Sequence, residues 1–485
     1  NGNLRKCASQ KGSSKGMSRV LAFDFGASTG RAILGEYENG RLSYREIHRF
    51  DNELVTENGK LCWNFPYLLS EVKKAIEMAN DVEALAFDTW GVDYGIIGAD
   101  GELKGLPVCY RDTRTKNAPE KIFEKISPER LYALTGNQIM NINTLFQLSV
   151  EEKDGDMFLF MPDLFAYALC SVKSAEQTIA STSQMLDLKK VCWQKEAFAL
   201  SGKSEKMLPP IVKSASVAGE YNGIKVIKVA GHDTQCAVCA MPEADGETPA
   251  FLSCGTWSLI GCENDLPILT KKSMEDELSN ELGANGKINY LKNISGLWLI
   301  QEIRRNFRKE GKEYSYNDME QLARQEKAFE FFINPDDEVF AAPENMPEKI
   351  RDFCKRTGQG IPETDGALVR CIYESLAMKY RFAIEQIEEN TGKKFDVLHL
   401  LGGGTKDSFL CQMTADSLNI PVTAGPTEAT ALGNIMLQLI ALGDLESVED
   451  GRRLLASSEN VKIYKPENAR EFSAAYDKFK TVITK

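Results

Sequence analysis

Residues 224–241 constrain the fold more than any other part of the chain. An apolar run at 224–230 leads into a turn at 231–234, and a run of small residues follows at 235–241. This order predicts a strand, a tight turn and a helix. The turn of such a unit lies at the end of a sheet. The carboxylate of Asp233 is therefore predicted to lie at the mouth of a binding site, where it could meet a substrate hydroxyl.

The first half of the chain is predicted to open with an antiparallel meander. Asn39 and Gly40 lie between two apolar runs and are a strong hairpin signal. A helix and a buried strand follow the meander. The expected strands are at residues 20–23, 31–38, 42–48 and 84–87, and the expected helix is at 66–79.

The start of the second half weakly resembles the first hairpin, because it has a strand, a glycine-containing turn with a hydroxyl residue and a return strand. Alternating strands and helices then predict an α/β class. The expected strands are at residues 250–253, 257–262, 397–401 and 421–424, and the expected helices are at 365–390, 407–418 and 427–441.

This pattern predicts two α/β domains with an active site in the cleft between them. Residues 1–16 are polar and basic and are interpreted as a disordered expression tag. The predicted organisation continues with an N-terminal domain at 17–241, a linker at 242–249 and a C-terminal domain at 250–485.

Composition argues against several classes of partner. The net charge of −12 repels nucleic acids and anionic membranes, so neither is expected as a partner. No apolar run is long enough to span a bilayer. We expect a cytoplasmic protein that is a monomer or a weak homo-oligomer.

The twelve cysteines are predicted to be buried thiols in a reducing compartment. Cys236 and Cys239 have the spacing of a redox or zinc pair, but no second pair accompanies them, so a structural role is favoured. Whether Cys354 and Cys371 pair is left open by the sequence.

Three glycine-containing turns are candidates for nucleotide binding. Consecutive backbone N–H groups in the turns at 26–31 and 254–256 could bind phosphate oxygens, and Arg31 adds a positive charge. Asp24 could hold a hydrated Mg²⁺ that bridges a phosphate. The glycines at 402–404 follow a buried strand and could face a flat ligand such as adenine. Ordinary hairpin turns are the alternative.

Asp233 is the candidate general base for phosphoryl transfer to an alcohol. A carboxylate beside the attacking hydroxyl orients it and takes its proton late in such a reaction. His48 and His399 are interpreted as structural, whereas His232 either stabilises the turn or contacts substrate.

Polar and aromatic residues gather at 88–93 and 110–114, after predicted strands. Sugars are bound by such groups, because aromatic faces contact C–H groups and charged side chains bind hydroxyls. Salt-bridged loops are an equally good interpretation of both segments.

These pieces, in this order, resemble the FGGY carbohydrate kinases of the actin-like ATPase superfamily. The resemblance runs from about Val20 to Leu445. Its most specific segments are 26–31, 45–50, 88–93, 110–114, 143–148, 232–234, 253–259, 291–294, 296–299 and 424–430.

The resemblance implies two ribonuclease H-like domains and transfer of phosphate from ATP to a ketose with Mg²⁺. It favours L-rhamnulose as the ketose, which would give L-rhamnulose 1-phosphate. Asp233 would accept the proton and Asp24 would assist the metal. The implied ATP contacts are Ala27, Ser28, Thr29, Gly30, Arg31, Thr256, Gln301 and Gly403. The implied sugar contacts are Gly91, His232, Asp233, Thr234 and Asn293.

Three positions depart from the usual family pattern. Thr29 stands where Ser is frequent and keeps the hydroxyl, and Cys254 replaces another small residue. Asp407 stands where Asn is common, next to the expected adenine contact.

Two other functions remain open from the sequence. The substrate could be another ketose, such as L-fuculose or L-xylulose. The chain could instead be an actin-like ATPase that uses nucleotide for a conformational switch and binds no sugar.

Overall fold

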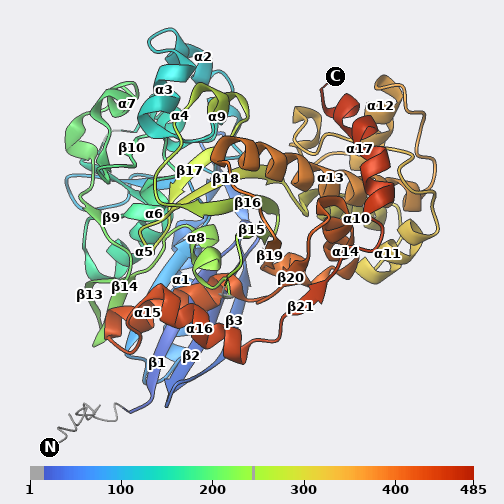
Figure 1. The fold of residues 1–485 in the computed structure, drawn as a ribbon. Helices are drawn as coiled ribbons and strands as arrows, with labels where there is room; N and C mark the ends of the chain where they lie inside the picture. The colour runs from blue at the N-terminus through green and yellow to red at the C-terminus, as the bar shows by residue number, and fades with distance from the viewer. Residues whose placement is uncertain (1–15, 154, 243–245, 485) are drawn as a thin grey trace, which may run out of the picture.

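The computed structural model describes residues 16–153, 155–242 and 246–484. Residues 1–15 of the predicted tag and 243–245 of the predicted linker lie outside the described residues. Each half of the chain is built on one large mixed sheet (Figure 1). This arrangement confirms the predicted α/β class with two domains.

Strand β1 organises the first sheet, which has the order β13–β14–β6–β1–β2–β3. It pairs antiparallel with β2 and parallel with β6. β1 is almost entirely buried and β6 entirely so, because helices pack on both faces of the sheet, and this explains their continuous apolar sequence. The strands are β1 (Ser18–Phe25), β2 (Thr29–Glu38), β3 (Arg41–Asp51), β6 (Ala84–Thr89), β13 (Ser216–Tyr221) and β14 (Ile224–Lys228).

The second sheet repeats this plan around β15, in the order β17–β18–β16–β15–β19–β20–β21. β15 pairs antiparallel with β16 and parallel with β19. The turns after β1 and β15 therefore occupy equivalent places in the two sheets. The strands are β15 (Pro249–Cys254), β16 (Trp257–Asn264), β17 (Ser279–Leu282), β18 (Ile288–Ser295), β19 (Val397–Leu401), β20 (Val422–Ala424) and β21 (Lys462–Tyr464).

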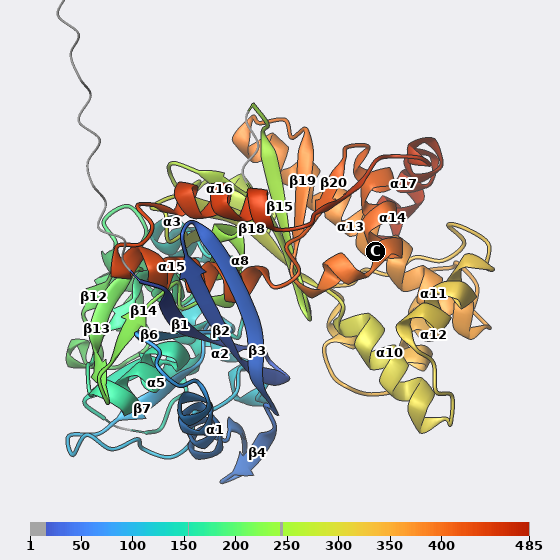
Figure 2. The same cartoon turned by 90° about the horizontal axis from the view of Figure 1, so that it is seen from below.

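Helices α8 (Asp233–Cys239) and α15 (Ala429–Leu442) pack against each other between the two sheets (Figure 2). α15 comes from the second half of the chain but contacts β1 and β6 of the first sheet, and α8 contacts β15 of the second. One buried apolar cluster contains residues of both helices and of both sheets. The two halves therefore share a core.

Other helices cover the outer faces. Helices α1 (Phe65–Met78) and α5 (Met161–Cys170) belong to the core on the other side of the first sheet. The long helix α13 (Asp365–Thr391) forms the centre of the second lobe and contacts α10, α11, α12, α14 and α17. Among the described residues, no helix is both long and apolar enough to cross a lipid bilayer.

The remaining helices are short or lie at the periphery. They are α2 (Ala118–Phe123), α3 (Pro128–Thr135), α4 (Thr144–Ser149), α6 (Gln177–Ala180), α7 (Lys195–Ala199), α9 (Lys271–Glu275), α10 (Trp298–Lys309), α11 (Tyr316–Arg324), α12 (Met346–Arg356), α14 (Ser408–Leu418), α16 (Val448–Ser458) and α17 (Ala469–Ile483).

The remaining strands form small two-stranded sheets. They are β4 (Leu54–Glu57), β5 (Lys60–Trp63), β7 (Tyr94–Ile97), β8 (Met157–Phe160), β9 (Ala175–Glu176), β10 (Leu186–Asp187), β11 (Cys192–Trp193) and β12 (Ile211–Val212).

The predicted turns at 26–31 and 231–234 are both longer than those in the structure. The first turn is shorter than predicted, because Gly26 N donates to Thr29 O at 2.9 Å and β2 begins at Thr29. Gly30 and Arg31 therefore lie in a strand. Asp233 is the first residue of α8 and not a residue of the turn before it.

Gly433 permits the close crossing of α15 and α8, and we expect Gly433→Ala to destabilise the fold. A Cβ at this position would lie 1.9 Å from the backbone oxygen of Cys236, which cannot move aside. Overpacking of this kind costs about 1–3 kcal/mol or more. Urea unfolding measures the loss.

The matched control is Gly451→Ala in α16. Its Cβ would meet the methyl end of Met436 at 2.2 Å, and that flexible end can rotate away. We expect stability close to the parent protein for this control. Equal stability of Gly433→Ala and the parent would show that the two helices are free to separate.

Candidate active site

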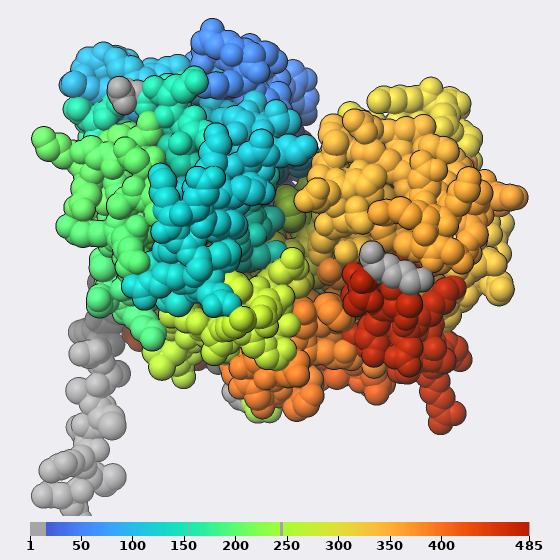
Figure 3. Space-filling model, turned by 90° about the horizontal axis from the view of Figure 1, so that it is seen from above, coloured from blue at the N-terminus to red at the C-terminus, as the bar shows by residue number. Residues whose placement is uncertain are grey.

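A cavity of about 320 Å³ lies between the two halves. The turn after β1, the turn after β15 and the glycines after β19 all contribute to its wall, and the predicted turns therefore converge. Figure 3 shows the molecule hollowed between its blue-to-green half and its yellow-to-orange lobe. The volume is in the range typical of small-molecule sites.

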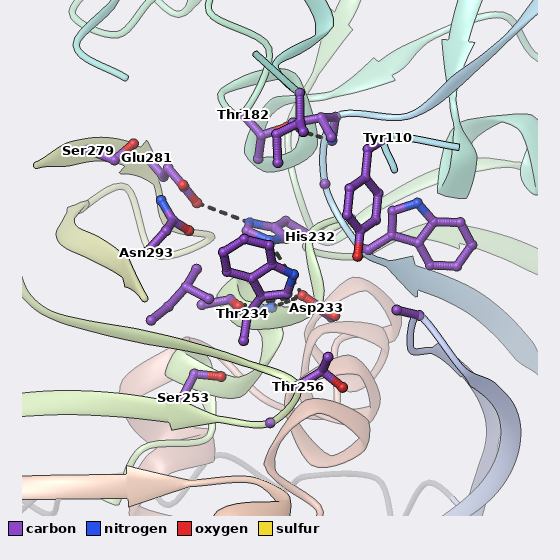
Figure 4. A pocket seen from close by; sticks show the side chains of 18 of the residues that line it. Tyr110, Thr182, His232, Asp233, Thr234, Ser253, Thr256, Ser279, Glu281 and Asn293 are labelled. Atoms are coloured by element: carbon purple, nitrogen blue, oxygen red, sulfur yellow. Dashed lines mark hydrogen bonds and ion pairs between the residues drawn. The ribbon is translucent and has the colours of Figure 1, made fainter. Parts of the chain in front are cut away.

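Asp233 lies in this cavity with its side chain 30% exposed (Figure 4). Its Oδ1 accepts a hydrogen bond from Thr234 N at 2.6 Å. Partial burial raises the pKa of Asp233 to about 6; His232 lowers it, and the charge of Asp24 raises it further. The carboxyl is therefore mostly ionised at pH 7 and close to the range in which a general base is effective.

The imidazole of His232 lies between two carboxylates. Its Nδ1 is 3.0 Å from Oε2 of Glu281, and its Nε2 is 3.4 Å from Oδ1 of Asp233. Burial lowers the pKa of His232, but the carboxylates of Glu281, Asp233 and Glu176 together outweigh burial and raise it. His232 therefore both stabilises this region and faces the cavity.

The structure brings all the predicted sugar contacts together. Gly91, Thr234 and Asn293 line the same cavity as His232 and Asp233. The side-chain amide of Asn293 donates to Oε1 of Gln138 at 3.0 Å, which joins β18 to the first half of the chain.

Gly91 lies against Thr182. A Cβ at position 91 would meet the side chain of Thr182 at 3.2 Å, so a side chain there would crowd the wall. The Thr182 hydroxyl accepts from Val92 N at 3.1 Å and is fixed by that bond.

The aromatic wall of the cavity is held by the buried carboxylate of Asp93. Its Oδ2 accepts from the indoles of Trp63 and Trp90, at 2.7 and 3.0 Å, and from Tyr110 N at 3.0 Å. Its Oδ1 accepts from Gln147 Nε2 at 2.9 Å. Asp93 is therefore structural, and of the residues it holds, Trp90 and Tyr110 line the cavity.

The segment at 110–114 divides between the two interpretations. Tyr110 lines the cavity. Arg114 does not line it and forms an ion pair with Glu151, with 2.9 Å between the charged groups. Arg111 packs over the ring of Trp298 at 4.7 Å and so joins the two halves.

On the predicted nucleotide side, the structure places Ala27, Thr256 and Gly403 in the cavity wall. The other predicted ATP contacts do not line this cavity, and their roles stay predictions. They are Ser28 in the exposed turn, Thr29, Gly30 and Arg31 in β2, and Gln301 in the first turn of α10.

Internal packing explains several of the glycines. A Cβ at Gly30 would meet the ring of Phe50 at 2.3 Å, and one at Gly404 would meet Sγ of Cys254 at 2.4 Å. Gly402 has a φ of +82° and so adopts a conformation that favours glycine. Gly403 alone of the three consecutive glycines has open space at its Cβ position, so it is the one that leaves room for a ligand.

Arg31 is engaged by two carboxylates, Asp24 and Glu428. Burial alone would lower the pKa of Arg31, but these carboxylates outweigh it and raise the pKa. Glu428 directly precedes α15, so this ion pair links the two halves. The predicted contact of Arg31 with phosphate would have to compete with both carboxylates.

Asp88 lies beside Asp24 in adjacent parallel strands and is fully buried. Its Oδ2 accepts from Asn434 Nδ2 of α15 at 2.7 Å, and its Oδ1 has no hydrogen-bond partner among the described residues. Burial, with the charges of Asp24 and Asp233, raises the pKa of Asp88 well above its usual value. Three carboxyl groups therefore lie near one another, and burial favours the neutral form of Asp88.

Asp407 has a structural explanation. Its Oδ2 accepts from the Tyr373 hydroxyl at 2.6 Å, and its Oδ1 accepts from Leu410 N at 2.9 Å and so caps α14. An Asp in place of the family's frequent Asn therefore suits the local fold.

The predicted burial of the cysteines is confirmed for nine of the eleven that the structure describes, whereas Cys192 is exposed and Cys170 is half-buried. Cys236 and Cys239 are buried free thiols in α8, and burial raises the pKa of Cys239 to about 12. Cys354 and Cys371 are also buried free thiols. Within the described residues, no cluster of three or more potential ligands is arranged for a metal ion.

His48 and His399 do not line the cavity, and their contacts and burial agree with a structural role. His48 contacts Glu71 at 2.6 Å. Burial lowers the pKa of His399 to about 4, so that imidazole is neutral at pH 7.

Family comparisons identify the class of protein. Residues 19–242 match the N-terminal domain, and residues 250–442 the C-terminal domain, of the FGGY family of carbohydrate kinases. The chain belongs to this family, which confirms the resemblance seen in the sequence.

The relatives and the solved structures agree with this assignment. A rhamnulokinase of Bacteroides thetaiotaomicron is 38% identical, with 96% of this chain and 99% of that protein covered. A rhamnulokinase of Ligilactobacillus salivarius is 37% identical, with 96% and 99% covered.

Two solved structures share the fold. A gluconate kinase from Lactobacillus acidophilus matches with a TM-score of 0.77 at 15% identity, with 96% of this chain and 98% of that chain covered. A glycerol kinase from Plasmodium falciparum, solved with ADP, matches with a TM-score of 0.73 at 14% identity, with 96% and 97% covered.

Sequence reasoning missed three residues of the site. Glu281 contacts His232, Gln138 contacts Asn293, and Asn434 contacts Asp88. Asn434 could have been noticed as a polar residue within a strongly apolar helix, and Glu281 as an acidic residue within a short strand. Both patterns indicate a buried partner.

We expect Asp93→Asn to destabilise the cavity wall, because an amide nitrogen cannot accept the hydrogen bonds that the carboxylate accepts. Each N–H left buried and unpaired costs about 1–3 kcal/mol. Urea unfolding and the near-ultraviolet circular dichroism of the tryptophans measure this. Asp100→Asn, with a side chain 54% exposed, is the control. An unchanged tryptophan spectrum and parent-like stability in Asp93→Asn would contradict the assigned role.

Proposed function

We propose that the protein transfers the terminal phosphoryl group of ATP to a ketose, L-rhamnulose, and forms L-rhamnulose 1-phosphate. The convergence of Asp233 with glycine-containing turns from both halves in one cavity carries this proposal. A hydroxyl bound at Asp233 and a phosphate chain held by the turns would meet there. The names of the relatives favour L-rhamnulose among ketoses.

Asp233 acts as the base in this proposal. Its carboxylate accepts a hydrogen bond from the attacking hydroxyl, orients it toward the phosphorus and takes the proton on a carboxylate oxygen as the new bond to phosphorus forms. Phosphoryl transfer passes through a loose transition state, so orientation contributes more than early removal of the proton.

Backbone groups bind the phosphates. The turns at 26–28 and 254–256 lie on the two sides of the cleft. Gly26 N and Gly255 N donate within these turns, to Thr29 O and Trp257 O, so the N–H groups of the neighbouring turn residues would bind the phosphate chain. Gly403 leaves room for the adenine side of the nucleotide. Closing the two halves over both substrates would exclude water that could otherwise receive the phosphoryl group.

The acidic residues fit Mg²⁺. Asp24 and Asp88 lie side by side, and Oδ1 of Asp88 is buried without a hydrogen-bond partner among the residues described. Mg²⁺ is commonly held by one or two carboxylates, water and substrate phosphates. Asp24 would hold the hydrated ion, whose positive charge offsets that of the phosphates.

The sugar end of the cavity suits a deoxyketose. Trp90, Met140 and Ile142 supply an apolar wall that can contact the methyl group of L-rhamnulose. Thr234 and Asn293 supply polar groups for its hydroxyls.

The substrate is tested by a coupled assay of ADP release with L-rhamnulose, L-fuculose and L-xylulose. We expect ADP release to depend on sugar. The apolar wall should favour the methyl-bearing deoxyketoses L-rhamnulose and L-fuculose over L-xylulose, and the names of the relatives favour L-rhamnulose as the sugar with the highest kcat/KM. A higher value with another ketose would reassign the substrate. Release at one rate with and without sugars would instead favour a switch ATPase.

We expect Asp233→Asn to fold normally, since the change is nearly isosteric, and to lose about a hundredfold to ten-thousandfold in kcat. The assay is single-turnover phosphorylation of L-rhamnulose, with circular dichroism to verify folding. Asp477→Asn, with a side chain 91% exposed, is the control and should keep parental turnover. Parental turnover in Asp233→Asn would reject this residue as the base.

A further inference from the structure

Glu281 reaches the base from the opposite half of the chain. It lies on β17, at the edge of the second sheet, and is 4% exposed. Figure 4 shows its carboxylate directed at His232, which precedes α8 of the first half. The line of contacts Glu281–His232–Asp233 therefore crosses from one half to the other.

Hydrogen bonds fix Glu281 in this position. Its Oε2 lies 3.0 Å from Nδ1 of His232 and accepts from Nε2 of Gln235 at 2.8 Å. Gln235 in turn accepts a hydrogen bond from Asn289 of β18, the strand beside β17. Two side chains of the first half thus hold the carboxylate, and it orients the imidazole so that Nε2 faces Asp233.

We propose that Glu281 is a positioning residue for phosphoryl transfer: it anchors Nδ1 of His232, and the imidazole it holds sets the orientation and the charge environment of Asp233. This inference rests on the proposed role of Asp233 as the base. Glu281 acts through His232 and has no part in bond making or breaking.

The charges around His232 and Asp233 determine the direction in which loss of the Glu281 charge shifts the pKa values of these two residues. His232 is faced by Glu281 of β17, Asp233 of α8 and Glu176 of β9, and all three carboxylates favour its protonated form. Asp233 is faced by His232, which lowers its pKa, and by Asp24, which raises it. Asp88 of β6 is a further acidic neighbour of Asp233.

Loss of the charge at position 281 should therefore lower the pKa of His232 and raise that of Asp233. In the parent protein, kcat/KM for L-rhamnulose should fall below a midpoint near pH 6, because the pKa of Asp233 is about 6 and only its ionised form accepts a proton. In Glu281→Gln the midpoint should move to higher pH by about one unit, with about tenfold lower activity on the acidic side. Activity at pH 9 should change least.

Tyr132→Phe is the matched control. The Tyr132 hydroxyl donates to Leu278 O at 2.7 Å and also joins the first half to the segment that leads into β17, but it does not contact His232. This variant should keep the parental midpoint. Glu281→Asp keeps the charge and should give a midpoint between those of the parent and Glu281→Gln.

Histidine-labelled protein gives a readout that is independent of turnover. The chain has three histidines, so the imidazole signals of His48, His232 and His399 can be assigned by single substitutions and followed by nuclear magnetic resonance. The His232 signal should titrate at lower pH in Glu281→Gln, or in Glu281→Asp if the first variant does not fold.

Unchanged midpoints for both kcat/KM and His232 in a folded variant would overturn the role of Glu281. Parental turnover in Asp233→Asn would instead overturn the base, so the two failures are distinguishable. A shift in Tyr132→Phe equal to that in Glu281→Gln would assign the effect to the junction between the halves and would also overturn the proposal.

Discussion

The close crossing of α8 and α15 fixes how the two halves of the molecule sit against each other. Gly433 brings the backbones of these helices together, and the helices separate the two sheets. The first sheet positions the turn after β1, and the second positions the turn after β15 and the glycines after β19. A crossing without Gly433 would move these turns apart, so a packing contact remote from the chemistry determines whether one cavity exists.

The second constraint is electrostatic. Asp24, Asp88 and Asp233 lie near one another, with Asp233 in the cavity wall, and burial raises the pKa of Asp88 and of Asp233. Each of these carboxylates has a side-chain partner: His232 contacts Asp233, Arg31 contacts Asp24, and Asn434 contacts Asp88. Asn434 comes from the opposite half of the chain. The protein thus holds a group of carboxyl side chains by contacts that include one from the opposite half. Such a site suits a cation brought together with a phosphate chain.

The sequence predicted the parts of this structure that depend on local pattern. The strands around β1 and β15 and the long helix α13 followed from apolar runs and helical spacing, and the turn residues followed from glycine. The contacts between distant segments could not be predicted in this way. Glu281 meets His232, and Asn434 meets Asp88, only after the sheets have packed. The crowding of Gly30 by Phe50, and of Gly404 by Cys254, is likewise not visible in the sequence.

The most direct measurement is a crystal structure of the protein with the ketose and a non-hydrolysable ATP analogue bound together. The proposed function predicts a sugar hydroxyl within about 2.6–3.2 Å of a carboxylate oxygen of Asp233 and in line with the terminal phosphorus. A sugar bound elsewhere, or one whose nearest hydroxyl to the phosphorus lies beside a different base, would contradict it.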